Sequence, residues 1–108
     1  MLKELQQEVG NWSLQNFGPQ EAWKPLLGIG EEVGELNHAY LKRSQGIRTT
    51  ENHDEDIEDA AADIIIYLCD FCCKENIDLE ATLQKVWDRV KKRNWQANPE
   101  GPKEDTNG

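Results

Sequence analysis

Residues 60–73 read AAADIIIYLCDFCC, and only two aspartates, Asp63 and Asp70, interrupt this apolar stretch. No part of the chain shows the alternation of apolar and polar residues that is typical of a strand, and helical periodicity accounts for most of the sequence. A helix that is apolar on all sides is buried by its neighbours, here by the rest of the fold and by a second subunit. We therefore expect an all-α protein that forms a homo-oligomer.

Four helices are predicted from apolar periodicity and from residues that favour helix ends. Gly18-Pro19 ends the first helix, Pro25 suits the first position of the second, and Asp78 is a plausible N-cap of the fourth. The expected ranges are 2–17, 25–44, 54–76 and 79–93. Four helices with short connections predict a four-helix bundle. Residues 1–97 are expected to form one domain, and 98–108, without apolar side chains, a disordered tail.

Length, hydropathy and charge exclude several classes of protein. A chain of 108 residues with 37% hydrophobic content suits one modest core. The longest apolar run, Ile64 to Cys69, is far shorter than the roughly 20 residues that cross a bilayer, and no apolar signal core follows Met1. A cytoplasmic protein without a membrane partner is expected. A net charge of −9 should repel the phosphate backbone of nucleic acid. Nucleic acid is therefore not expected as a partner.

The three cysteines, Cys69, Cys72 and Cys73, lie within one apolar segment. No second pair completes a zinc site or a disulfide framework. The spacing of Cys69 and Cys72 matches a redox motif, but no strand precedes it, so buried reduced thiols are the expected state.

Acidic residues gather on two of the predicted helices. At about 100° per residue, Glu31, Glu32 and Glu35 share a sector beside the apolar stripe of the second helix. That sector alone would most simply be a solvated face. On the apolar third helix, Asp59, Asp63 and Asp70 fall within about 40° of one another.

Burying this aspartate line requires a source of positive charge. An unpaired buried carboxylate costs several kcal/mol, and the few nearby bases are not expected to neutralise all three. Oxygen ligands without His or Cys favour Mg²⁺ or Mn²⁺, and Mg²⁺ in proteins is commonly shared with the phosphates of a substrate. The acidic residues therefore predict metal-dependent phosphate chemistry.

Three segments in order resemble the helical MazG-like nucleoside triphosphate pyrophosphohydrolases, which are related to dimeric dUTPases. Residues 31–36, EEVGEL, match the E-E-x-x-E motif of that family. Residues 63–68, DIIIYL, match the aspartate and apolar run that close its E-x-x-D motif, and 86–95, VWDRVKKRNW, is similar to the basic end of its last helix. Each motif alone is weak, but their order over Pro25 to Trp95 is moderately specific.

The resemblance implies a Mg²⁺-dependent, house-cleaning enzyme that cleaves a (d)NTP into a (d)NMP and pyrophosphate, working as a homodimer or homotetramer. Mn²⁺ is a possible substitute. By similarity, the metal ligands are Glu32, Glu35, Asp59 and Asp63, and Glu31 is the catalytic residue that binds a second ion or orients the attacking water. Candidate substrate contacts are Lys42, Arg43, Asp70, Lys91, Lys92 and Arg93, with Trp12 and Trp23 as stacking candidates for the base.

The chain departs from the family pattern at position 60, where Ala60 stands in place of the glutamate. Asp59 can substitute as a ligand with a shorter arm, because a helix brings i and i+4 together as well as i and i+3. The alternative is a non-catalytic nucleotide-binding or helical interaction protein of the same fold. His38, about 60° from Glu35, is expected at a surface or interface, and His53 is expected to be solvated.

Overall fold

The computed structural model describes residues 1–46 and 50–101, which form four helices and no strand. The helices are α1 (Leu2–Phe17), α2 (Trp23–Gln45), α3 (His53–Lys74) and α4 (Leu79–Val90). The prediction of an all-α fold is confirmed. Within the described ranges, no helix combines the length and apolarity that crossing a membrane requires. The predicted tail lies mostly outside these ranges.

The helix ends follow local chemistry. α1 has the predicted bounds and stops at Gly18, whose φ of 70° favours glycine. The Asn52 side chain accepts a hydrogen bond from the Glu55 N–H at the start of α3, and Asp78 accepts one from the Ala81 N–H at the start of α4, as predicted for that N-cap. α2 begins two residues before Pro25, which the first turn tolerates because its N–H groups have no intrahelical acceptor.

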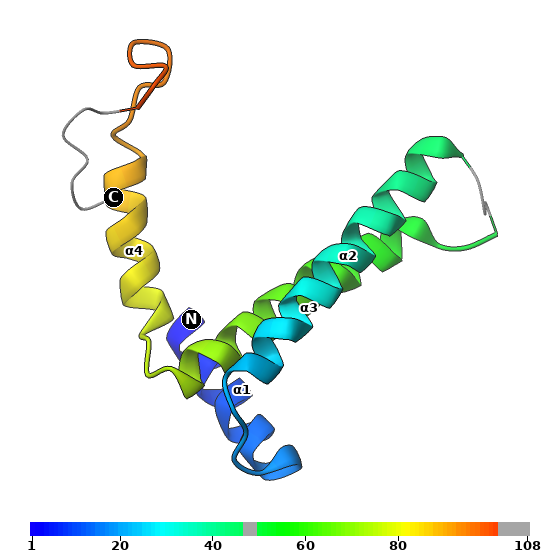
Figure 1. The fold of residues 1–108 in the computed structure, drawn as a ribbon, viewed down its shortest axis with the longest axis vertical. Coiled ribbons are helices and arrows are strands. Elements are labelled where there is room, and N and C mark those ends of the chain that lie inside the picture. The colour runs from blue at the N-terminus through cyan, green and yellow to red at the C-terminus, as the bar shows by residue number, and fades with distance from the viewer. Residues whose placement is uncertain (47–49, 102–108) are drawn as a thin grey trace.

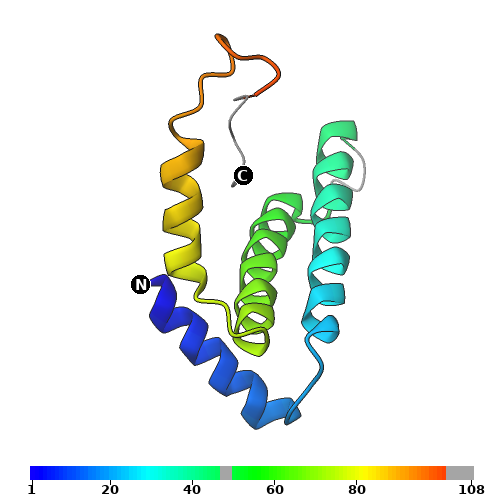
Figure 2. The ribbon, with the colours of Figure 1, turned by 60° about the vertical axis from the view of Figure 1, so that its left-hand side comes forward.

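α2 and α3 form a long helical hairpin, and α1 crosses the end of α3 that lies farthest from the hairpin loop (Figure 1). α4 leaves the same junction and contacts chiefly α1, whose N-terminal end lies at its base (Figure 2). Its direction diverges widely from that of the hairpin (Figure 1). The radius of gyration is 17.5 Å, whereas about 13 Å is usual for a compact chain of this length. One chain therefore does not close the expected four-helix bundle by itself.

The described residues bury few large apolar side chains. The buried hydrophobic residues are Val9, Ala39, Ala60, Cys69 and Cys72. Ile65 and Ile66 on α3 remain about 40% exposed, although the sequence predicts a helix buried on all sides. The cysteines are free, as expected, and burial raises the pKa of the Cys69 and Cys72 thiols, which disfavours reactive thiolates.

A polar network holds α1 against α3. The Lys74 ammonium donates hydrogen bonds to Asp70 Oδ1 at 2.6 Å and to the Ser13 hydroxyl at 3.1 Å, and Ser13 donates to Asp70 Oδ2 at 3.0 Å. Ser13 is fully buried, and the Asp70 and Lys74 side chains are only 13% and 15% exposed. Lys74 therefore neutralises one of the three aspartates, Asp70.

Gly28 lets α2 approach α3 closely. A Cβ added there would lie 2.5 Å from the Tyr67 ring, whereas one added at Gly30 would meet nothing within 4 Å. We expect Gly28→Ala to lower the free energy of unfolding by about 1–3 kcal/mol through overpacking. Gly30→Ala, the matched control in the same helix, should raise it by about 0.5–1 kcal/mol. Urea unfolding of both variants measures the difference, and equal effects would contradict the close approach.

Candidate functional site

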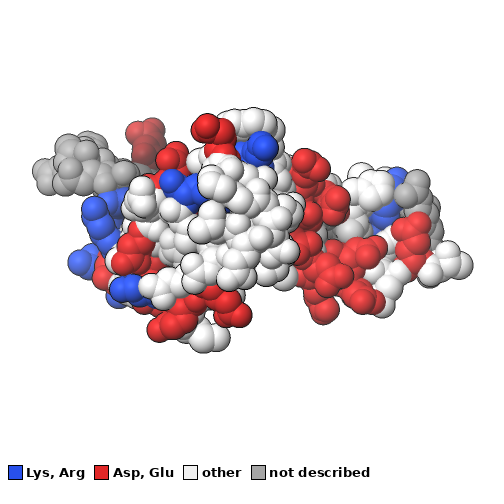
Figure 3. Space-filling model, turned by 90° about the horizontal axis from the view of Figure 1, so that it is seen from below, with Lys and Arg blue, Asp and Glu red and all other residues white. Residues whose placement is uncertain are grey.

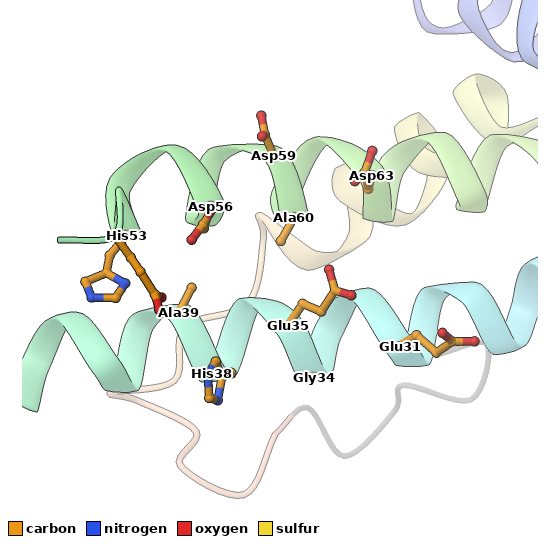
Figure 4. Close-up of a pocket in the computed structure, with 11 residues that line it drawn as sticks. Glu31, Gly34, Glu35, His38, Ala39, His53, Asp56, Asp59, Ala60 and Asp63 are labelled. Carbon is orange, nitrogen blue, oxygen red and sulfur yellow. The ribbon is translucent and has the colours of Figure 1, made fainter. Parts of the chain in front are cut away.

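Acidic side chains of α2 and α3 surround an open pocket of about 690 Å³, which we call the acidic pocket (Figure 4). Its lining residues are Glu31, Gly34, Glu35, His38, Ala39, Glu51, His53, Asp56, Asp59, Ala60 and Asp63. Seen from below, the side of the molecule formed by the hairpin carries a broad group of acidic side chains (Figure 3). Four predicted residues, Glu31, Glu35, Asp59 and Asp63, line this pocket. No three of the predicted ligands Glu32, Glu35, Asp59 and Asp63, which are all described residues, have ligand atoms within 4.8 Å of one another.

A second pocket, of about 470 Å³, lies where α1 meets α2 and α3. We call it the aromatic pocket, because Trp12, Phe17 and Tyr67 line it. The Trp12 and Phe17 rings meet edge to face, with centroids 5.5 Å apart. The remaining lining residues are Gln20, Lys24, Pro25, Glu32, Asp63, Ile66 and Asp70. Asp63 borders both pockets, so the two are neighbours.

Glu32 belongs to the aromatic pocket and carries the most perturbed carboxyl group of the site. Its Oε2 atom is buried and accepts no hydrogen bond from a donor group of the described residues, although a proton shared with the Glu35 carboxyl contributes to the raised pKa of Glu32. Burial raises the pKa of Glu32 above its ordinary value of 4.5, and the negative charges of Glu35 and Asp63 raise it further. A buried carboxylate oxygen without a donor is costly, so a proton shared with Glu35 or a bound cation would stabilise this half-buried group.

The α3 side of the acidic pocket differs from the sequence prediction. Asp56 and Ala60 point toward α2, whereas the Asp59 side chain points away from it (Figure 4). Ala60 is only 3% exposed, so it closes the position where the family has a glutamate. Asp56 was missed, although its spacing of i+4 to Ala60 and i+7 to Asp63 places it on the same helical face. The replacement of the missing glutamate by Asp59 remains a prediction.

Two histidines lie at the hairpin-loop end of the acidic pocket. His53 is only 9% exposed, so the expectation that it is solvated was wrong. Its ring and the carboxylates of Glu51 and Asp56 offer three ligand atoms that all lie within 4.8 Å of one another, a spacing that could hold a metal ion. His38 lies on α2 and is exposed, as expected.

The predicted basic contacts are not gathered at the pockets of one chain. Lys42 and Arg43 lie in the last turn of α2, where Arg43 forms an ion pair with Asp54 at 2.7 Å. Lys91 pairs with Asp88 at 3.1 Å, and the Arg93 guanidinium lies 5.8 Å from the centroid of the Trp95 ring. Lys91, Lys92 and Arg93 follow the end of α4, and α4 diverges from the hairpin.

The remaining predicted substrate contacts are divided between the aromatic pocket and the surface. Trp12 and Asp70 line that pocket, although Asp70 is already paired with Lys74. Trp23 lines neither pocket; it is 54% exposed, with the Lys24 ammonium 5.8 Å from its ring centroid. Of the two stacking candidates, Trp12 alone is placed beside the carboxylates.

Comparison of the chain with protein-family models, with curated proteins and with solved structures found no match.

Proposed function

We propose that this protein is a Mg²⁺-dependent nucleotide pyrophosphohydrolase that cleaves a (d)NTP into a (d)NMP and pyrophosphate. The proposal joins two independent lines of support. One is the resemblance of residues 31–36, 63–68 and 86–95 to the MazG-like enzymes. The other is the arrangement of carboxylates on two facing helices around an open pocket, which is how helical bundles build metal sites.

The single observation that carries the proposal is the buried Glu32 Oε2 atom without a donor, close to the charges of Glu35 and Asp63. Three carboxylates in this arrangement repel one another, and among the described residues no ammonium or guanidinium group forms an ion pair with them. Their all-oxygen donor set fits Mg²⁺, with Mn²⁺ as a substitute. Glu32, Glu35 and Asp63 would hold the ion, with Asp59 as a further predicted ligand.

When bound, Mg²⁺ would neutralise the negative charge that develops on the phosphoryl oxygens. The chain's own groups would do the rest. Trp12, at the edge of the aromatic pocket, offers a ring on which the base can stack while the triphosphate extends toward Asp63 and the acidic pocket. Glu31, an exposed carboxylate on the acidic pocket, would accept a hydrogen bond from the attacking water and orient it.

Ala60 favours a second candidate function, namely nucleotide binding without hydrolysis. This buried methyl group occupies the α2-facing position of the family glutamate, so the site has one carboxylate fewer there. Pyrophosphate release from a mixture of dNTPs, with Mg²⁺ and with EDTA, separates the two functions. The proposed enzyme gives Mg²⁺-dependent pyrophosphate, whereas a binding protein gives none and still retains labelled nucleotide in equilibrium dialysis.

Millimolar Mg²⁺ is expected to raise the melting temperature, because the ion binds only the folded arrangement of the carboxylates. The raised pKa of Glu32 gives this effect a pH dependence. In the metal-free protein, the protonated Glu32 stabilises the fold below its ordinary pKa, and this contribution is lost as the pH rises through the raised value. The Mg²⁺-induced shift should therefore be larger at about pH 7.5 than at about pH 5. An equal melting temperature with and without Mg²⁺ at both values would contradict a metal site.

A further inference from the structure

Among the described residues, hydrogen bonds join the first turn of α4 to α1. The Leu79 N–H donates a hydrogen bond to Gln6 Oε1 at 3.1 Å, and the Lys3 N–H donates one to Glu80 Oε1 at 3.3 Å. Beyond this turn the helix contains no buried residue, although its apolar side chains recur along one face. Leu83 and Trp87 are 54% and 53% exposed. Such an amphipathic helix normally has its apolar stripe covered.

The solvent-accessible area of the chain is larger than that of a compact monomer of the same mass. One chain exposes 8232 Å², whereas a compact monomer of 12.4 kDa exposes about 6,100 Å². The whole chain thus exceeds that area by about 2,100 Å², more than the roughly 800 Å² that each partner buries in a standard interface. On the hairpin, Val33, Ile65 and Ile66 are each 40% exposed or slightly more, and they offer a counterpart for α4.

Charge complementarity also favours a second copy of this chain as the partner that packs on the α2–α3 hairpin. The end of α4 and the residues after it carry Arg89, Lys91, Lys92 and Arg93, whereas the acidic pocket combines five carboxylates of α2 and α3. In one chain these opposite charges lie on arms that diverge (Figure 1), and the acidic side chains gather on the hairpin side (Figure 3). A second copy supplies both the apolar stripe and the complementary charge.

We propose that α4 packs on the α2–α3 hairpin of a second copy of this chain and brings its basic end to that copy's acidic pocket. In a two-fold dimer each copy gives one α4 and receives the other, so both sites are completed in trans. Lys91 and Arg93 then contact the triphosphate bound by the other subunit. The role given to these bases rests on the proposed function, whereas the packing of α4 rests on exposed area and charge alone.

The packing is tested by multi-angle light scattering of the full chain at micromolar concentration. The native chain is expected to be a dimer or tetramer, and Leu83→Glu combined with Trp87→Glu should give a monomer that keeps its helical circular dichroism. Lys85→Glu is the matched control, because Lys85 lies on the opposite face of α4 and should leave assembly unchanged. A monomeric native chain would overturn the proposal, because α4 would then not pack on a second copy. Dissociation by Lys85→Glu as well as by the stripe variant would overturn it too.

Completion in trans is tested by mixing two inactive variants. Asp63→Asn removes a pocket ligand, and the double variant Lys91→Glu/Arg93→Glu removes the basic end. After mixing and exchange, half of the two-fold dimers pair an intact pocket with an intact basic end at one site, so about a quarter of the native activity should return. Completion within one chain would restore none and would overturn the inference. An inactive native chain that still forms the α4-dependent oligomer would instead reject the proposed enzyme and retain the packing.

Discussion

Asp63→Asn should reduce pyrophosphate release by more than about 100-fold, because loss of partners that only orient metal ligands already costs 10–100-fold. Asp63 borders both the acidic and the aromatic pocket, so it is placed where the phosphates and the base of one nucleotide would join. The substitution keeps the shape of the side chain and removes its charge. Mg²⁺ affinity, measured by calorimetry, should fall together with turnover.

The same substitution should leave the metal-free protein folded and equally or more stable. Its charge raises the pKa of Glu32, so its removal relieves a repulsion that the metal-free fold otherwise carries. Glu58→Gln is the matched control: Glu58 is an exposed carboxylate of α3 that lines neither pocket, and its loss should change neither turnover nor Mg²⁺ affinity. If Asp63→Asn instead loses about 1–3 kcal/mol of metal-free stability while activity persists, Asp63 is a structural acceptor.

Lys74→Met should lower the free energy of unfolding by about 3–5 kcal/mol, since it leaves Asp70 buried without its counter-charge. Ser13 also loses the donor that satisfies its hydroxyl oxygen. For a chain of this size, the loss corresponds to a fall in melting temperature of well over 10 °C, on the order of 4–8 °C per kcal/mol. Urea unfolding and calorimetry in EDTA measure the effect without any contribution from a metal.

Arg43→Met is the matched control for Lys74→Met, because the Arg43–Asp54 pair is 46% and 75% exposed and should contribute less than about 1 kcal/mol. If Lys74→Met does not fold, the double variant Asp70→Asn/Lys74→Met keeps the experiment informative. Removing both charges should recover much of the lost stability, since a neutral pair no longer leaves a buried ion. Similar losses for Lys74→Met and Arg43→Met would show that the buried network does not hold α1 on α3.

The sequence alone was sufficient for the all-α class, the four helices and most of their ends. These features depend on neighbours along the chain: Gly18 ends α1 with a positive φ, and the Asp78 side chain caps α4. It also predicted that Glu31 and Glu35 share a face of α2, because residues four apart lie on one side of a helix, and both line the acidic pocket. The resemblance to MazG-like enzymes remains a prediction, as does every role of these residues in binding or catalysis.

Only the tertiary structure decided how the helices are rotated against one another and what each side chain meets. Periodicity gives the angle between two residues on one helix, but not which part of that helix faces its neighbour. The rotation of α3 about its axis directs Asp56 and Ala60 toward α2, while Asp59 points away. The rotation of α2 in turn places Glu32 at the aromatic pocket. For the same reason, the neutralisation of Asp70 by Lys74 and Ser13 required the packing of α1, and the divergence of α4 required the whole arrangement.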